Sequence, residues 1–268
     1  MDSQNSEVME TYYVSHGSPM LPLEETPATQ FFKGLGNSIK QKPKAILVVS
    51  GHWNTRELMV NSGAKHSTIH DFYGFPRELY QLRYDAPGAP EVAKRVQELL
   101  QEAGYKSVED PKRGLDHGAW IPLLLMYPKA DIPVIQLSLQ PQKDGLHHYN
   151  VGRALAPLTK EGVLIIGSGT TTHNLRSIGS YETTPTWAKA FDSWLNDALI
   201  NGRFDEVIHY LEKGPHAETA HPTPDHFVPL LVALGAAGEG AKTKRVHHSW
   251  ELQTMSMASF SFTPVASS

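Results

Sequence analysis

Strands that are apolar along almost their whole length constrain the fold of this chain most. Ala45–Ser50 reads AILVVS and Val163–Ser168 reads VLIIGS. A strand of this kind must be covered on both faces, which is typical of parallel sheets flanked by helices. Further strands are predicted at Glu10–Ser15 and Ile132–Ser138. The sequence therefore predicts an α/β fold whose central sheet is mixed and largely parallel, with helices on both faces.

Helical patterns lie between these strands. PEVAKRVQELLQEAG begins with Pro90 and stops at Gly104, and WIPLLLMY is a short buried helix. Thr184 is expected to cap a third helix, with Pro185 at its first helical position. DHFVPLLVALGAAG predicts a fourth, which tolerates Pro229 only in its first turn. Two late strands, Arg245–Trp250 and Ser256–Phe262, are expected to pair at an edge of the sheet.

Length and composition bound the organisation of the chain. Its 268 residues suit one domain, 1–268, with flexible ends at 1–8 and 264–268. The net charge of -4 comes without a basic run, so we expect no nucleic-acid partner. No apolar run approaches 18 residues, and no signal peptide is recognisable, so we expect no membrane span and a cytoplasmic location. The absence of cysteine excludes disulfides, thiolate zinc sites and cysteine nucleophiles.

Histidines follow the predicted strands, and the chain has 14 of them. His16 follows TYYVS, His52 follows ILVVSG, and His173 follows GSGTTT. Ligands of open α/β sheets bind outside the carboxyl ends of the strands. One such histidine would more often be structural, whereas three in the same topological position predict a site.

Two further segments supply candidate histidines. In AHPTPDHFVPLL, His226 is expected at the start of a helix, where the dipole favours a neutral, metal-binding ring. His221 in the same segment is more often a capping or solvated residue. His117, in RGLDHGAWIPL, could act as an acid, a base or a hydrogen-bonding partner of a substrate. Solvated faces are expected for His66, for His209, for the pair His147 and His148 and for the pair His247 and His248. His70 lies in a long aromatic loop, where lining a pocket and being solvated are equally open alternatives.

Neutral imidazoles without thiolates suit Zn²⁺ or Fe²⁺. His16 and His52 are the strongest ligand candidates and His226 is the third, with His173 either a fourth ligand or a base beside the metal. A catalytic metal needs an open position, which favours three ligands and one free histidine that can act as a general base.

Six motifs, in one order along nearly the whole chain, support a resemblance: SHGSP, SGHW, HDFYGFP, RGLDHGAW, GSGxxTHN and HPTPDHFVPL. The sequence resembles the class III extradiol ring-cleaving dioxygenases, and within them the plant DOPA 4,5-dioxygenase group. The resemblance implies a single α/β domain. It also implies a non-haem Fe²⁺, or Zn²⁺ as in some relatives, held by His16 and His52, with His226 at the remaining ligand position.

The resemblance also implies roles and a reaction. His173 matches the active-site histidine that is described as base or as metal ligand, and His117 matches the one that contacts substrate or oxygen. The reaction inserts both atoms of O₂ into a catechol, and 4,5-cleavage of L-DOPA gives a seco-DOPA semialdehyde, the precursor of betalamic acid. The partners would be a small catechol and O₂, and the protein a monomer or small homo-oligomer.

Two departures leave alternatives open. Well-studied class III enzymes use two histidines and a carboxylate, whereas His226 stands at the third position here and suits Zn²⁺ equally well. Members specialised for betalain pigment usually carry proline after the active-site histidine, and this chain has Asn174. We therefore expect weak activity on L-DOPA or another catechol as substrate. The alternatives are a Zn²⁺-dependent hydrolase that uses the same histidines, and a non-enzymatic metal-binding or interaction protein.

Overall fold

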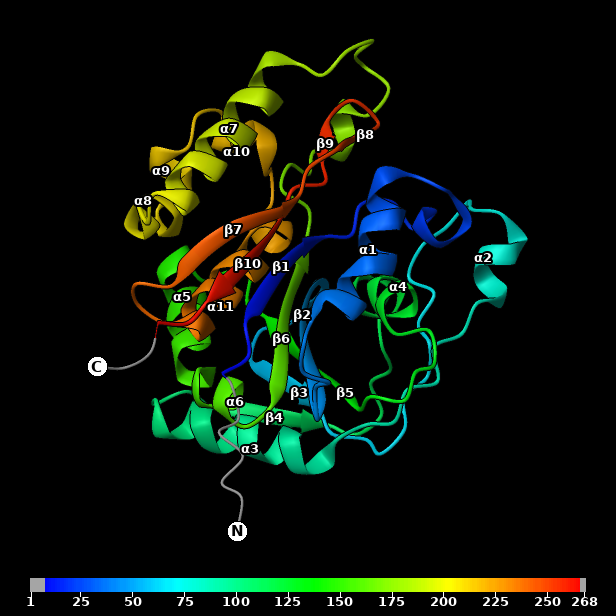
Figure 1. The fold of residues 1–268 in the computed structure, drawn as a ribbon, viewed down its shortest axis with the longest axis vertical. Helices are drawn as coiled ribbons and strands as arrows, with labels where there is room; N and C mark the ends of the chain where they lie inside the picture. The colour runs from blue at the N-terminus through cyan, green and yellow to red at the C-terminus, as the bar shows by residue number, and fades with distance from the viewer. Residues whose placement is uncertain (1–7, 266–268) are drawn as a thin grey trace.

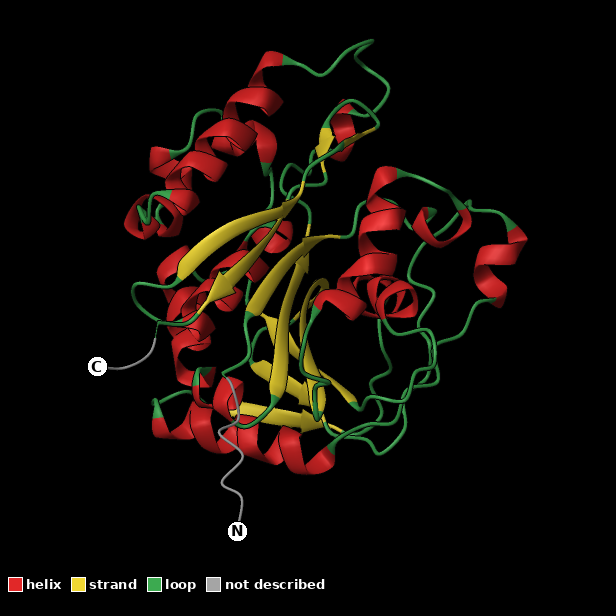
Figure 2. Cartoon of the chain, in the orientation of Figure 1, coloured by secondary structure: helices red, strands yellow, loops and turns green. Residues whose placement is uncertain are grey.

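An eight-stranded mixed sheet forms the centre of the protein, in the computed structural model that describes residues 8–265 (Figure 1 and Figure 2). Its strand order is β4-β3-β5-β2-β6-β1-β10-β7, and β8 pairs with β9 in a separate hairpin. The strands are β1 Thr11–Ser15, β2 Ala45–Asn54, β3 Leu58–Asn61, β4 Ser107–Asp110, β5 Val134–Leu139, β6 Val163–Gly169, β7 Lys242–His247, β8 Trp250–Glu251, β9 Met255–Ser256 and β10 Ser259–Thr263.

Parallel pairs occupy the middle of this sheet. β5, β2, β6 and β1 pair with one another in parallel, whereas β3 is antiparallel to β5, and β10 is antiparallel to both β1 and β7. The expected class, a single α/β domain with a largely parallel sheet, is therefore confirmed. The predicted pairing of the last two strands at an edge is also found, although β10 additionally joins β1 and so brings the two ends of the described chain together.

Helices cover both faces of the sheet. The α-helices are α1 Pro27–Ser38, α2 Arg77–Gln81, α3 Pro90–Glu102, α4 His117–Met126, α5 Gly145–Leu155, α6 Pro157–Lys160, α7 Thr186–Ile200, α8 Phe204–Ile208, α9 Tyr210–Lys213, α10 Ala217–Ala220 and α11 Val228–Ala237. Three short 3₁₀ helices are η1 Leu21–Leu23, η2 Leu175–Ser177 and η3 Pro224–His226. Figure 1 shows α1 and α4 on one side of the sheet and α5 and α11 on the other.

Alternate residues of the central strands pack into two separate hydrophobic cores, one on each face of the sheet. Leu47, Val49 and Ile165 pack on the side of α5 and α11, while Val48 and Ile166 pack on the side of α1 and α4. Because successive side chains of a strand point to opposite faces, strands with two buried faces must be apolar throughout. The helices α4 and α11 are also buried on almost every side, which explains their nearly unbroken apolar sequences.

Several local predictions are wrong. The helix α7 begins at Thr186 with Pro185 as its N-cap, so Thr184 does not cap it. The strand predicted to end at Ser50 continues to Asn54, with an irregular register against β5 after Val49. His66, His148 and His221 are buried rather than solvated.

The elements of the fold that lie outside the predicted set include the helices α1 and α5 and the strands β3 and β4. The strands β3 and β4 have only four residues each, so their patterns are too short to stand out.

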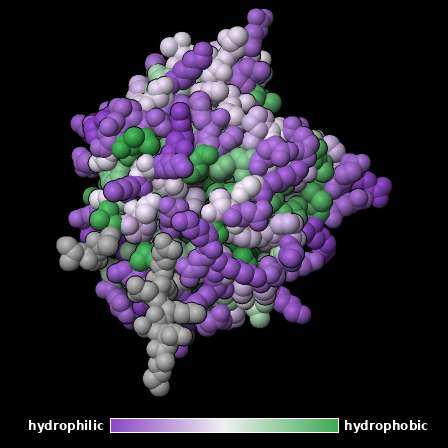
Figure 3. All heavy atoms as spheres, in the orientation of Figure 1, coloured by the Kyte–Doolittle hydropathy of each residue, from purple (hydrophilic) through white to green (hydrophobic). Residues whose placement is uncertain are grey.

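The surface and the chain ends complete the description. In the view of Figure 3, hydrophilic residues cover most of the face, with hydrophobic residues interspersed. Among residues 8–265, no helix is long and apolar enough to cross a membrane. The ends expected to be flexible, 1–8 and 264–268, lie largely outside the described residues.

The buried His148 predicts how the stability of this fold depends on pH. Its Nδ1–H donates to the Asp144 carbonyl at 2.8 Å and its Nε2 accepts from the Gln140 N–H at 3.3 Å. Burial lowers the pKa of His148 from 6.5 to about 4. Between these values the unfolded chain binds a proton that the folded chain excludes, so stability falls as pH drops from 6.5 to about 4.

We expect His148→Gln to flatten this dependence by up to one proton, about 1.4 kcal/mol per pH unit. Urea unfolding from pH 7 to pH 4 measures the slope in wild type and variant. Equal slopes in the two proteins would contradict the assignment.

Candidate metal centre

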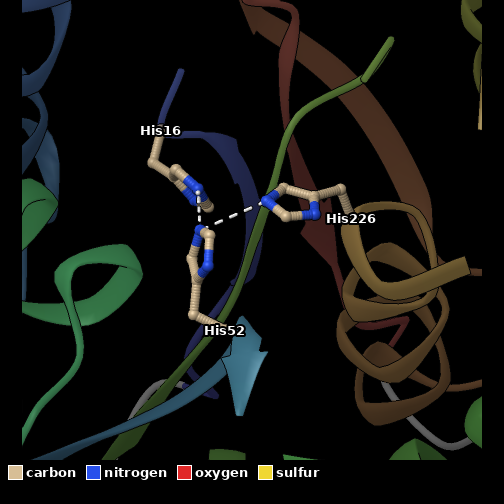
Figure 4. A group of neighbouring side chains, drawn as sticks. All are labelled: His16, His52 and His226. Atoms are coloured by element: carbon tan, nitrogen blue, oxygen red, sulfur yellow. Dashed lines mark hydrogen bonds between the residues drawn. The ribbon is translucent and has the colours of Figure 1, made fainter. Parts of the chain in front are cut away.

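Three histidines converge at the carboxyl ends of the central strands (Figure 4). His16 follows β1, His52 lies in the irregular last part of β2, and His226 is the final residue of η3. Their Nε2 atoms lie 3.1 Å apart between His16 and His52 and 3.2 Å apart between His52 and His226. Figure 4 shows the rings pointing toward one another from separate segments.

Hydrogen bonds at Nδ1, the ring nitrogen away from the converging Nε2 atoms, fix the tautomers of His16 and His226. The Ser168 hydroxyl donates to the Gly118 carbonyl at 2.6 Å, so its oxygen accepts from His16 Nδ1–H at 2.9 Å. His226 Nδ1–H donates to the Asp225 carboxylate at 2.7 Å. Both Nε2 atoms therefore carry free lone pairs, because a neutral imidazole has only one proton.

The residues present fit a bound cation. If His52 carries its proton on Nε2, it can donate one hydrogen bond, either to His16 Nε2 or to His226 Nε2. The other Nε2 lone pair then has no donor among these three rings. A divalent metal coordinated by imidazole would satisfy all three, and the outward hydrogen bonds of His16 and His226 are those that metal-ligating histidines make.

Burial keeps the three rings neutral. It holds the pKa of His16 and of His226 well below the usual range, and the neighbouring histidines lower both further. Burial, followed by the nearby His117, lowers the pKa of His52 to about 4. Burial is thus the main cause of the lowered pKa of His226, rather than the helix dipole expected from the sequence, because η3 has only three residues.

Two glycines allow the backbone of η3 to approach the strands. A Cβ on Gly51 would lie 2.8 Å from the Asp225 carbonyl oxygen and 3.2 Å from His226 Nδ1. A Cβ on Gly169 would lie 2.0 Å from the His226 carbonyl oxygen. The glycines of the SGHW and GSG motifs are thus required by packing around the third histidine.

His173 lies against this group but outside it. Its ring stacks on His226 with centroids 3.5 Å apart and planes 3° apart. Its backbone N–H donates to the Ala220 carbonyl at 2.9 Å, which ties the loop after β6 to α10. The group whose ligand atoms lie within 4.8 Å of one another around His226 consists of His16, His52 and His226, without His173.

His117 borders the group next to His52. It is the first residue of α4, and its ring centroid lies 3.9 Å from that of His52. Its Nδ1–H donates to Asp71 at 2.8 Å, and its backbone N–H donates to the same oxygen at 3.0 Å. Asp71 is the site residue that sequence reasoning missed, and its place inside the HDFYGFP motif was the available signal.

A second carboxylate, Asp116, joins β2 to the start of α4. It is fully buried, accepts from the Ser50 hydroxyl at 2.6 Å, and caps α4 through the Gly118 N–H at 3.0 Å. The guanidinium of Arg113 lies 3.3 Å from it and compensates its charge. The Ser50 oxygen in turn accepts from the His52 backbone N–H at 3.1 Å, which fixes the position of that residue.

Comparison with known proteins gives a consistent result. Residues 10–263 match the family model described as the catalytic LigB subunit of aromatic ring-opening dioxygenase. The chain is 52% identical to a Beta vulgaris protein named 4,5-DOPA dioxygenase extradiol, over 96% of this chain and 97% of the relative. It is 39% identical to an Escherichia coli K12 protein of the same name, over 85% of each chain.

A solved structure supports the fold match. An Escherichia coli K12 protein, described as uncharacterized, superposes with a TM-score of 0.79 at 33% identity. The match covers 94% of this chain and 99% of that one.

The close approach at Gly51 predicts a selective effect on metal binding. We expect Gly51→Ala to push η3 and the His226 ring outward and to weaken Zn²⁺ binding about 10- to 100-fold, as measured by competition with a chromophoric chelator. Gly34→Ala is the matched control, because nothing lies within 4 Å of a Cβ at this position in α1. Equal metal affinity in the two variants would contradict the packing argument.

Proposed function

This chain belongs to the LigB family of aromatic ring-opening dioxygenases, and we propose that it is an extradiol enzyme that cleaves catechols such as L-DOPA at the 4,5 position. The observation that carries the proposal is the group of three neutral histidines with converging Nε2 atoms, flanked by two further histidines. Relatives named 4,5-DOPA dioxygenase extradiol, from Beta vulgaris and Mirabilis jalapa, match almost the full chain.

We propose His16, His52 and His226 as the ligands of a non-haem Fe²⁺. When bound, this iron would supply the redox chemistry that lets a catechol react with O₂. The overall change adds both oxygen atoms of O₂ and breaks the ring bond beside the two hydroxyl groups. An all-histidine ligand set also binds Zn²⁺, which has no redox chemistry, so the identity of the metal decides between ring cleavage and metal-assisted hydrolysis.

We propose that the two flanking histidines act on the substrate. We propose His173 as the base that accepts a proton from a catechol hydroxyl, since its ring lies beside the ligands without joining them. His117 has Nδ1–H engaged by Asp71, which leaves Nε2 as a hydrogen-bond acceptor. The ring of Phe72 meets His117 edge-on, with the ring centroids 5.5 Å apart.

Asn174 supports the proposal that L-DOPA is a weak substrate. Its φ of -127° is one that proline cannot adopt. Its side chain donates to the Thr219 carbonyl at 2.7 Å and accepts from the Arg176 N–H at 3.2 Å. The loop that carries His173 therefore has a different conformation from one with proline at this position.

Oxygen uptake tests the proposed function directly. We expect Fe²⁺-loaded protein to consume O₂ with at least one catechol of a panel that includes L-DOPA, and to form a yellow ring-opened product. Zn²⁺-loaded protein should consume none. His173→Ala should lower kcat by about 10²- to 10⁴-fold, the usual effect of losing a general base. No uptake with any catechol, in protein shown to contain Fe²⁺, would refute ring cleavage.

Substrate preference tests the role of Asn174. We expect wild type to show a lower kcat/KM for L-DOPA than for 4-methylcatechol. Asn174→Pro should change this ratio by about tenfold in favour of L-DOPA. Proline cannot adopt the φ of -127° found here, so the backbone after His173 must take another conformation. Asn174→Ala is the control, since it removes the side-chain bonds and leaves φ free. A wild type that prefers L-DOPA, or equal ratios in the two variants, would refute this role.

A further inference from the structure

Asp71 lies on an anchored segment between β3 and α2. The ring Nε2 of the preceding His70 bonds the Leu82 carbonyl at 2.8 Å, and the Trp120 indole N–H donates to the Ile69 carbonyl at 2.8 Å. On the other side, the Tyr80 hydroxyl donates to the Phe72 carbonyl at 3.2 Å. The backbone on both sides of Asp71 is therefore held in place.

The two oxygens of this one carboxylate face two different histidines. Oδ1 accepts both the Nδ1–H and the backbone N–H of His117, at 2.8 and 3.0 Å. Oδ2 lies 4.0 Å from Nδ1 of His52. The ligand-capable atoms of His52, Asp71 and His117 form a second group within 4.8 Å of one another.

We propose that Asp71 is a positioning residue that orients two site histidines at once: it holds His117 in the Nδ1–H tautomer and turns the metal-facing nitrogen of His52 toward the centre. This proposal rests on the proposed function and deepens it. His16 and His226 have their own Nδ1 acceptors, Ser168 and Asp225. Asp71 is the carboxylate that faces the Nδ1 atom of the third ligand.

The consequence for the substrate lies at His117. With its proton on Nδ1, the unprotonated Nε2 can accept a hydrogen bond from a catechol hydroxyl. The rings of His52 and Phe72 pack against His117, with centroids 3.9 and 5.5 Å from its own, and limit rotation of the His117 ring. A carboxylate that fixes tautomer and orientation is the arrangement used by histidines that handle protons in catalysis.

Two substitutions of Asp71 distinguish its interaction with His117 from its interaction with His52. Asp71→Asn keeps an oxygen for both bonds of His117 but places an NH₂ group opposite His52. Asp71→Ala removes both interactions. Asp131→Asn is the control, because this exposed carboxylate pairs with Lys42 on the surface.

The first measurement needs no turnover. We expect ¹H–¹⁵N correlation spectra of the Zn²⁺-loaded protein to show an Nδ1–H tautomer for His117, assigned by its loss in His117→Ala. The signal should persist in Asp71→Asn and Asp131→Asn and disappear in Asp71→Ala. Zn²⁺ affinity, measured by chelator competition, should fall about tenfold in both Asp71 variants and stay unchanged in Asp131→Asn.

Kinetics of the Fe²⁺-loaded enzyme supply the second measurement. We expect Asp71→Ala to lower kcat/KM about 10- to 100-fold, with a smaller loss of kcat in Asp71→Asn. In a His117→Ala background, Asp71→Ala should cost less than its effect in wild type, since most of that effect acts through His117.

Specific outcomes would overturn the proposal. An unchanged His117 tautomer and unchanged metal affinity in Asp71→Ala would do so. An undiminished effect of Asp71→Ala in the His117→Ala background would instead make Asp71 act directly, as a ligand or base. If wild type oxidises no catechol, the proposed function fails, while the spectra and the metal affinities still decide the role of Asp71.

Discussion

The close approach of the Asp225–His226 backbone to the ends of β2 and β6 is the constraint on which the site depends. Gly51 and Gly169 permit it, because a methyl group at either position would overlap the backbone of η3. This contact brings the third histidine to the two that the strands present. It also places the fully buried α11 directly behind the site, so that the position of the third histidine is set by packing of α11 against the sheet.

Burial then determines the chemistry of the assembled group. Desolvation of His16, His52 and His226 disfavours the imidazolium form, so the rings are neutral where water would leave part of them protonated. Hydrogen bonds to Ser168 and Asp225 place the remaining protons on the outer nitrogens. Low polarity around the rings, together with directional acceptors behind them, leaves the converging Nε2 atoms suited to hold a metal ion.

The two flanking histidines are restrained in different ways. His173 stacks on His226 and belongs to a loop tied to α10. His117 begins α4 and is hydrogen-bonded to Asp71. One flanking imidazole is thus held mainly by stacking and the other by a carboxylate.

The sequence alone determined the sheet class and the histidines near strand ends, because apolar runs and strand-to-loop transitions are local patterns. It also indicated His226 and His117 through their motifs. Only the tertiary structure decided which rings meet, since His52 and His226 are 174 residues apart. The hydrogen bond between Asp71 and His117 likewise became visible only there, and His148 and His221 proved buried rather than solvated. Such contacts depend on how distant segments pack, and no local periodicity records that packing.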